Sequence, residues 1–210
     1  MSLINEISEA LQKGKAKAVE DLVAKALDSG ENAQVILNDA FLAGMDIVGE
    51  KFKESEIYVP EVLMAARAMN KGMSLLKPHL TEQGVKPIGK AVIGTVKGDM
   101  HDIGKNLVAL MMEGKGIEVI DLGVDVSAEM FYEAYEREGA KIIACSSLLT
   151  TTMVEMKNVV EYFTQKGARD NVTIMVGGAP ITDKYRQSIG ADLYTPDAAT
   201  AADLARKALG

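Results

Sequence analysis

The spacing of hydrophobic residues divides the chain into two halves with different periods. In the first eighty residues, apolar side chains recur every three or four positions, as in helices with one buried face. Gly30 stops the second of these helices and Pro60 opens the fourth. The four runs extend from Leu3 to Leu11, Ala18 to Leu27, Leu37 to Phe52, and Val62 to Leu76. Four helices joined by short turns predict a small four-helix bundle.

The second half has the pattern of alternating strands and helices. The stretch Thr81–Gly89 contains glycine and proline without a period, so we interpret it as a linker with a domain boundary near residue 87. The predicted strands are residues 91–96, 117–122, 141–146, 172–177 and 191–195. The predicted helices are residues 104–115, 127–138, 152–166, 182–189 and 198–209. The sequence thus predicts a helical domain over 1–87 and an α/β domain over 88–210.

Alternating strands and helices indicate a parallel sheet covered on both faces and joined by right-handed crossovers. Five such units most often adopt the flavodoxin-like, doubly wound order 2-1-3-4-5, which is one form of the Rossmann-type architecture. Ligands of these folds bind beyond the carboxyl ends of the strands. Three loops should therefore lie side by side: residues 97–104, 146–150 and 177–180.

Composition narrows the function classes. The 210 residues carry a formal net charge of −7, which argues against nucleic acid as a partner because phosphate binding needs clustered Lys and Arg. No apolar run approaches the roughly 20 residues of a membrane span, and the N-terminus lacks a signal-peptide pattern, so we expect a cytoplasmic protein without membrane contact. The single cysteine, Cys145, lies in an apolar run and is expected to be a buried small hydrophobic residue.

The first loop holds a histidine between two aspartates. Residues two apart in an extended loop project to the same side, so Asp99 and His101 can approach each other. A carboxylate that accepts the Nδ1 proton leaves the Nε2 lone pair pointing outward, as in many metal-binding histidines. Gly104 permits a bulky group to approach the following helix. The alternative is a plain turn in which Asp99 or Asp102 caps the helix and His101 is merely exposed.

A zinc site built from protein ligands alone is hard to assemble here. Such a site needs three or four ligands, and the chain has two histidines and one cysteine. A metal at His101 would therefore arrive with most of its ligands already supplied. A macrocyclic cofactor is the natural candidate.

The other two loops offer hydroxyls and exposed backbone. Thr152 and Glu155 match a capping box, whereas Ser146 and Thr150 can bond a polar ligand. Gly177 and Gly178 would let a flat group lie against the chain, although a plain turn is equally allowed.

Together these loops carry a recognisable signature. Asp99-x-His101-x-x-Gly104, then Ser146-x-Leu148, then Gly177-Gly178, resemble at these spacings the cobalamin-binding signature of methionine synthase and the corrinoid methyltransferase proteins. The helical half, especially Pro60–Met69, resembles the cap domain that precedes this module in the methyl-carrying branch. The resemblance covers nearly the whole chain. It is closest to the small corrinoid proteins that serve methylamine, methanol or methoxyl methyltransferases.

The resemblance implies a cofactor and roles for individual residues. A cobalamin or related corrinoid would bind base-off/His-on, with its own base detached and His101 as the lower ligand of cobalt. Asp99 would be the hydrogen-bond partner of His101, and Thr152 would extend this relay. The positions that match those lining the channel for the detached nucleotide tail are Gly104, Ser146, Leu148, Thr150, Gly177 and Gly178.

The function implied is that of a methyl carrier. Cobalt would accept a methyl group from a substrate:corrinoid methyltransferase and pass it to a second, methylcorrinoid:acceptor methyltransferase, whose acceptor is a thiol or tetrahydrofolate. A reductive activase is a further candidate partner. No acid or base for activating a methyl donor is evident in the sequence, so we expect the chain not to be catalytic alone.

Other classes share parts of this pattern. A corrinoid storage or delivery protein stays open as an alternative. An adenosylcobalamin mutase subunit shares the loop signature but normally lacks the helical cap. A light- or cofactor-sensing transcription factor would need an added DNA-binding domain, for which the acidic chain has no basic helix. A receiver-type signalling domain needs an acidic phosphoacceptor where Ser146 and Ser147 stand.

Overall fold

The computed structural model describes residues 2–210, which divide into two compact units. One unit comprises the residues up to Pro87 together with Gly114–Gly116, and the other comprises Ile88–Glu113 and Ile117–Gly210. No helix in the described part of the chain is long and apolar enough to cross a membrane.

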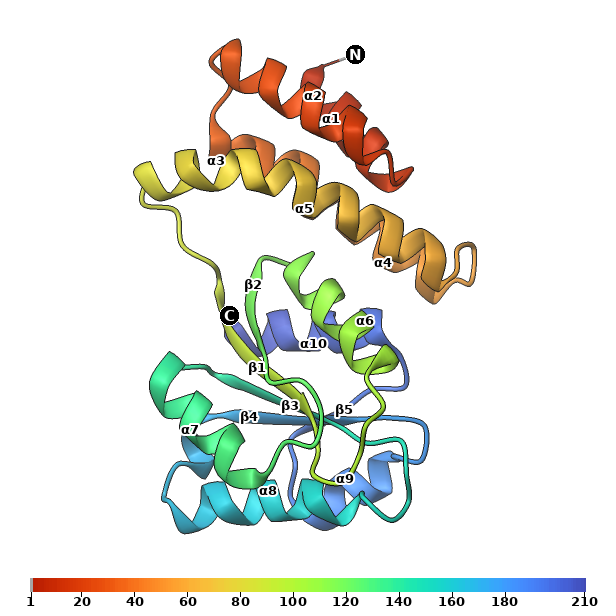
Figure 1. Cartoon of the computed structure of the whole chain (residues 1–210), viewed down its shortest axis with the longest axis vertical. Helices are drawn as coiled ribbons and strands as arrows, with labels where there is room; N and C mark the ends of the chain where they lie inside the picture. The colour runs from red at the N-terminus through yellow and green to blue at the C-terminus, as the bar shows by residue number, and fades with distance from the viewer. Residues whose placement is uncertain (1) are drawn as a thin grey trace. The chain divides into compact units, whose positions relative to one another are not determined.

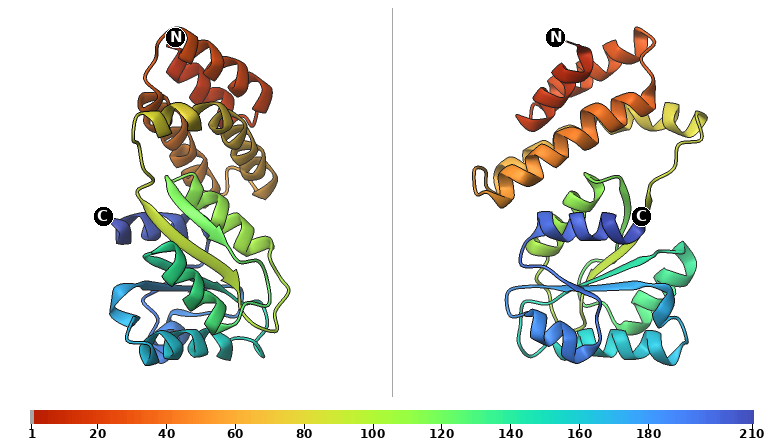
Figure 2. Two further views of the ribbon diagram at one scale, coloured as in Figure 1. Left: turned by 60° about the vertical axis from the view of Figure 1, so that its left-hand side comes forward. Right: turned by 180° about the vertical axis from the view of Figure 1, so that it is seen from behind.

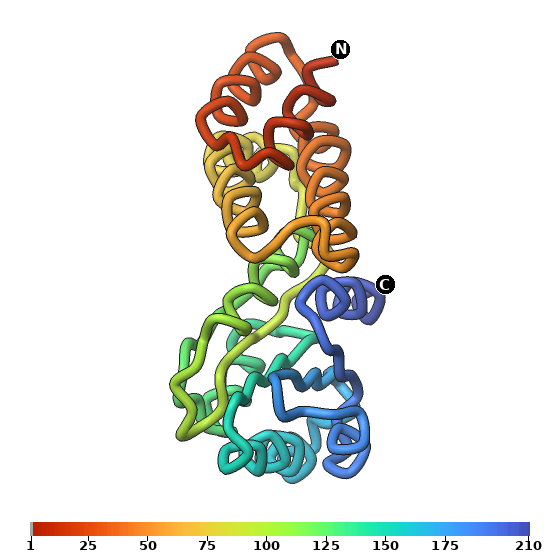
Figure 3. The backbone as a smooth tube through the Cα atoms, turned by 90° about the vertical axis from the view of Figure 1, so that its right-hand side faces the viewer, coloured from red at the N-terminus to blue at the C-terminus, as the bar shows by residue number. Residues whose placement is uncertain are grey.

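The first unit is the predicted helical bundle (Figure 3). Its elements are α1 (Leu3–Gln12), α2 (Ala16–Asp28), α3 (Ala33–Val35), the π-helical segment η1 (Ile36–Leu42), α4 (Ala43–Lys53) and α5 (Val59–Glu82). Elements α3, η1 and α4 follow one another without a break, so the predicted third helix is one helical run with a π-helical middle. The apolar periodicity could not reveal this widening, because 3.6 and 4.4 residues per turn give similar patterns over so short a stretch.

Small residues dominate the buried face of α5. Ala65, Ala68 and Gly72 are buried, whereas Leu63, which the periodicity placed on the apolar face, is 45% exposed. The packing at the buried face is close: a Cβ atom added to Gly72 would lie 2.5 Å from Cζ of Phe41. Where a helix approaches its neighbours this closely, small side chains occupy the interface and large ones are displaced from it.

The second unit is a five-stranded parallel sheet in the order β2-β1-β3-β4-β5 (Figure 1). Its strands are β1 (Gly89–Thr95), β2 (Ile117–Asp121), β3 (Ile142–Ser146), β4 (Thr173–Gly177) and β5 (Leu193–Tyr194). Its helices are α6 (Ile103–Glu113), α7 (Ala128–Glu138), α8 (Val154–Gln165), the 3-10 turn η2 (Arg169–Asn171), α9 (Asp183–Ile189) and α10 (Ala198–Leu209). The predicted strand order and the doubly wound α/β fold are confirmed.

The two faces of the sheet are covered by different helices. Helices α6 and α10 lie on one face, and α7, α8 and α9 lie on the other (Figures 1 and 2). The core beneath α7 and α8 is built around Phe131, Phe163, Ile143 and Ile174, all fully buried. Cys145 is buried in the same core, and burial raises the pKa of its thiol to about 12, as expected for an inert side chain.

The packing around Gly72 generates a stability prediction. Gly72→Ala should lower the free energy of unfolding by about 1–2 kcal/mol, because overpacking against Phe41 and Val19 outweighs the helix propensity gained by removing a glycine. Asn70→Ala, an exposed position on the same helix, is the matched control and should leave stability unchanged or slightly raised. Urea unfolding of the three proteins measures the difference. A stabilised Gly72→Ala variant would contradict the packing argument.

Candidate functional site

The ends of the three central strands lie at one level of the sheet. Thr95, Ser146 and Gly177 are the last residues of β1, β3 and β4, and the register pairs Thr95 with Ser146 and Ser146 with Gly177. The loops after these strands therefore begin side by side at the carboxyl edge of the sheet. This is the edge at which the sequence placed its candidate residues.

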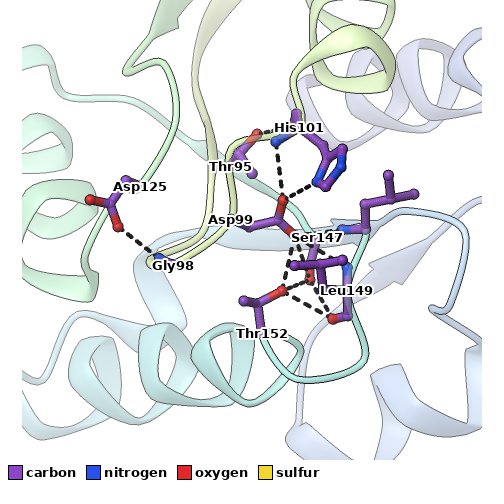
Figure 4. A network of polar contacts seen from close by, with 9 residues as sticks. Thr95, Gly98, Asp99, His101, Asp125, Ser147, Leu149 and Thr152 are labelled. Atoms are coloured by element: carbon purple, nitrogen blue, oxygen red, sulfur yellow. Dashed lines mark hydrogen bonds and ion pairs between the residues drawn. The ribbon is translucent and has the colours of Figure 1, made fainter.

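The carboxylate of Asp99 is the centre of a polar network at this edge (Figure 4). Asp99 is fully buried. Its Oδ1 atom accepts hydrogen bonds from the backbone N–H of His101 at 3.1 Å and from Nδ1 of the same residue at 2.8 Å. One carboxylate oxygen thus fixes both the backbone and the ring of the histidine.

The other oxygen of Asp99 binds the loop that follows β3. Its Oδ2 atom accepts from the backbone N–H groups of Leu148 at 2.8 Å and Leu149 at 3.2 Å, and from the hydroxyl of Thr152 at 2.9 Å. The hydroxyl of Ser147 lies 2.8 Å from that of Thr152 and 3.4 Å from Oδ2. Because the Thr152 hydroxyl lies closer to the carboxylate than the Ser147 hydroxyl does, we infer that Thr152 donates to Asp99 and Ser147 donates to Thr152.

These donors keep the buried carboxyl group charged. Burial alone would raise the pKa of Asp99, but the hydrogen bonds from the ring and backbone of His101, from Leu148 and from Thr152 together outweigh burial. The pKa of Asp99 is consequently held well below its usual range. At neutral pH the group is a carboxylate that can only accept hydrogen bonds.

The charge on Asp99 determines the tautomer of His101. A carboxylate oxygen cannot donate, so Nδ1 carries the proton and Nε2 of the neutral ring keeps its lone pair. The His101 side chain is 51% exposed, on the outer side of the fully buried Asp99. The geometry therefore presents one oriented nitrogen donor at the surface of this unit.

Thr152 does not act as the predicted helix cap. Helix α8 begins at Val154, after Met153, and the Thr152 hydroxyl donates to Asp99. The capping-box interpretation of Thr152 and Glu155 is therefore wrong, because the helix begins two residues later and the Glu155 N–H donates to the carbonyl oxygen of Thr152 at 3.0 Å. Asp102, the alternative cap for helix α6, accepts a side-chain hydrogen bond from Asn106 at 3.1 Å.

Ser147 is a site residue that the sequence reasoning missed. The sequence pattern favours Ser146, not Ser147, as a ligand contact. The structure buries Ser147 fully beside Asp99 and leaves Ser146 partly exposed at the strand end. The strict alternation of side chains along a strand would have given this signal, because neighbouring residues point to opposite sides.

The side chains of the remaining candidate residues lie outside the network, although the backbone N–H of Leu148 belongs to it. Thr150 and Leu148 are exposed in the turn before α8, and Gly104 is exposed in the first turn of α6. A Cβ atom added to Gly104 or Gly177 would meet no atom within 4 Å, so open space lies beside both. Gly178 differs: it has φ +132°, and a Cβ there would lie 1.9 Å from the carbonyl oxygen of Ser147. The fold itself requires glycine at 178.

Exposed apolar side chains gather around His101. The 88–210 unit exposes seven large hydrophobic side chains, and five of them lie within or just after the two loops that Asp99 joins. These five are Met100, Ile103, Leu148, Leu149 and Val154, with exposures from 40% to 79%. We call them the apolar rim. Exposed apolar side chains concentrated in two joined loops indicate a binding surface.

The residues around His101 could supply a metal ion with few protein ligands. Among residues 2–210, no cluster of three or more His, Cys, Asp or Glu side chains is arranged to hold a metal ion. A single oriented imidazole within an apolar rim suits a metal that is already held by a flat, largely apolar chelator. The residues present therefore fit a corrinoid.

Comparisons with known proteins point to the same group. Residues 89–204 match the family of B12 binding domains, and residues 3–77 match a second family with the same description. A corrinoid protein of Desulfitobacterium hafniense is 39% identical over 213 residues, covering 100% of this chain and 99% of its own. The trimethylamine corrinoid protein 1 of Methanosarcina acetivorans is 40% identical over 194 residues, covering 91% of this chain and 90% of its own.

Solved structures agree with these relatives. The methanol:cobalamin methyltransferase complex from Methanosarcina barkeri contains a chain that matches with a TM-score of 0.89 at 30% identity, covering 99% of this chain and 79% of that one. A cobalamin-binding protein from Desulfitobacterium hafniense matches with a TM-score of 0.82 at 30% identity, over the full length of both. With its signature loops, its strand order and relatives along its whole length, the chain belongs to the corrinoid proteins, the family built on B12 binding domains.

Proposed function

We propose that this protein is the methyl-carrying corrinoid subunit of a methyltransferase system. The observation that carries the proposal is the His101 imidazole, which Asp99 holds in one tautomer while Nε2 faces outward within the apolar rim. Relatives named corrinoid proteins of trimethylamine and dimethylamine, and the match to a methanol:cobalamin methyltransferase complex, support it. When bound, the corrinoid supplies a cobalt centre that takes up and releases a methyl group.

Each unit has a role in the proposal. Residues 1–87 are the helical cap domain, and residues 88–210 are the cobalamin-binding domain. His101 Nε2 is the lower axial ligand in a base-off/His-on mode, and Asp99 fixes the orientation of the ring. Second-sphere hydrogen bonds of this type orient metal-binding histidines and raise their basicity.

The surroundings of His101 divide into support and lining. Ser147 and Thr152 hold the Asp99 carboxylate from below, which leaves the ring of His101 as the outward-facing part of the network. We assign six residues in the loops that follow the three central strands to the channel for the detached nucleotide tail. They are Gly104, Ser146, Leu148, Thr150, Gly177 and Gly178. For Gly178 the close contact with Ser147 gives a structural reason as well.

Separate enzymes would perform the chemistry at the two ends of methyl transfer. We propose as partners a substrate:corrinoid methyltransferase and a methylcorrinoid:acceptor methyltransferase, with a reductive activase as a third. The complex solved for the Methanosarcina barkeri methanol system, which the chain resembles, supports the first of these.

The first prediction concerns the ligand of cobalt. Protein labelled with nitrogen-15 histidine, loaded with hydroxocobalamin and reduced to cobalt(II), should show the hyperfine splitting of one nitrogen-15 nucleus in its electron paramagnetic resonance spectrum. A hyperfine splitting from a nitrogen-14 nucleus would mean that the base of the unlabelled cofactor is still attached to cobalt. His101→Ala should lose the protein-derived splitting, and Asn106→Ala, a nearby polar position, should keep it.

The same loaded protein tests the carrier role. Reduced further to cobalt(I) by a chemical reductant and mixed with a methylamine or methanol and the matching substrate:corrinoid methyltransferase, it should undergo a change in visible spectrum that a second methyltransferase with its acceptor reverses. A storage or delivery protein would show no such cycle under these conditions.

The second prediction concerns the charge on Asp99. Asp99→Asn should lower the free energy of unfolding by about 2 kcal/mol at pH 7, because an amide places a donor against the N–H groups that now point at Oδ2. Since the folded-state pKa lies below the ordinary 3.8, the carboxylate's contribution is complete above that value and is lost as the pH falls toward the folded pKa.

The difference between wild type and Asp99→Asn should therefore be constant above about pH 5 and shrink below about pH 4. Chemical unfolding across this range measures it. Asp102→Asn, which changes an exposed aspartate in the same loop, should be nearly neutral. If the difference in free energy of unfolding grew as the pH fell, the assigned lowering of the Asp99 pKa would be refuted.

The third prediction separates the glycines. Gly104→Leu and Gly177→Leu should leave the unfolding temperature unchanged, because open space lies beside both, but should reduce corrinoid retention if these positions line the channel. Gly178→Ala should lower the unfolding temperature even without cofactor, because its Cβ would collide with Ser147. Retention of hydroxocobalamin on gel filtration, beside thermal unfolding of the apoprotein, gives both readouts. Normal retention in both Leu variants would remove them from the lining.

A further inference from the structure

The loop between β2 and α7 contains a residue in an unusual backbone conformation next to the histidine loop. Asp125 has φ +56°, and within residues 2–210 only Ser55 shares a positive φ among residues other than glycine. A left-handed aspartate costs backbone energy that neighbouring contacts must offset. The contacts of Asp125 show where it is held.

Asp125 binds the histidine loop twice. Its Oδ1 atom accepts the backbone N–H of Gly98 at 2.7 Å, and its own backbone N–H donates to the carbonyl oxygen of Asp99 at 3.1 Å (Figure 4). In this left-handed conformation the side chain and the backbone N–H of Asp125 both reach the loop that follows β1. Asp125 therefore restrains the backbone of the two residues that precede Met100 and His101.

The loop that carries Asp125 is itself firmly anchored. The Nζ atom of Lys105, whose side chain is 1% exposed, binds Oδ2 of Asp121, and Asp121 Oδ1 accepts the N–H of Gly123 at 2.8 Å. The carbonyl of Gly123 accepts the N–H of Thr95 at 2.9 Å, and the Thr95 hydroxyl donates to the carbonyl of His101 at 2.8 Å. These contacts tie the loop after β2 to α6, to the end of β1 and, through Thr95, to the backbone of His101.

We propose that Asp125 is a positioning residue for His101. It holds the backbone of Gly98 and Asp99 from the β2 side while the loop after β3 holds the Asp99 carboxylate, so the imidazole is fixed from two directions. The inference rests on the proposed function in that the oriented ring is taken as the cobalt ligand. Asp125 itself touches neither the ring nor the carboxylate of Asp99 in the contacts described.

A double-mutant cycle tests the assignment in the full-length chain. Asp125→Gly keeps the left-handed backbone accessible and removes the acceptor, whereas Asp125→Asn keeps a carbonyl oxygen in place of the carboxylate. We expect Asp125→Gly to raise the dissociation constant for hydroxocobalamin about tenfold, the factor that corresponds to one lost hydrogen bond. Asp125→Asn should keep most of the wild-type affinity. In the His101→Ala background, Asp125→Gly should have no further effect.

A readout without cofactor keeps the inference separate from the proposed function. Nitrogen-15 NMR of the apoprotein should show His101 as the Nδ1-protonated tautomer with a slowly exchanging ring proton. Asp125→Gly should speed that exchange by about tenfold, because the carboxylate partner is held less firmly. If wild type bound no corrinoid, the proposed function would fail, and this measurement would still decide the positioning role.

Controls distinguish positioning from general stability. Ser55→Gly, which relieves the other left-handed residue, should leave both the dissociation constant and the exchange rate unchanged. An equal weakening by Asp125→Gly with and without His101 would overturn the proposal, because Asp125 would then act on the fold alone. Unchanged exchange and affinity in Asp125→Gly would overturn it as well.

Discussion

A single buried carboxylate joins the two loops that make up the site. Asp99 cannot be buried as a charge unless its oxygens are fully hydrogen-bonded, and its donors come from two segments about fifty residues apart in sequence. The need to satisfy that charge brings the turn after β3 against the loop after β1. Once the loops are joined, the position of the histidine ring and the exposure of its outer nitrogen follow from the geometry.

The site holds the imidazole tightly on one side and leaves the other side open. The inner side has a carboxylate, two hydroxyls and several backbone donors, and the exposed side of the two loops carries the five apolar side chains of the rim. Such a surface can support and ligate a large flat group but offers little for activating a small substrate. This asymmetry agrees with a carrier whose reactions are completed by partner enzymes.

Much of this arrangement could be predicted from the sequence. The alternation of strands and helices after residue 87 gave the five parallel strands and their order, because right-handed crossovers leave few topologies. The spacing of Asp99 and His101 gave their contact, because it depends on neighbours in the chain. The contacts of Ser147 and Thr152 with Asp99 could not be derived in the same way, since they depend on how two distant loops meet. The π-helical segment at Ile36–Leu42 and the exposure of Leu63 were likewise hidden, because both reflect packing at close range.

The apolar rim is exposed to water in the protein without its cofactor. The exposed methionine, isoleucine, leucine and valine side chains of the rim form apolar surface beside the site, in a chain whose net charge is −7. A flat ligand that covers these side chains would remove apolar surface from water. Binding there would therefore stabilise the folded unit as well as load it, since a ligand that binds only the folded chain shifts the unfolding equilibrium.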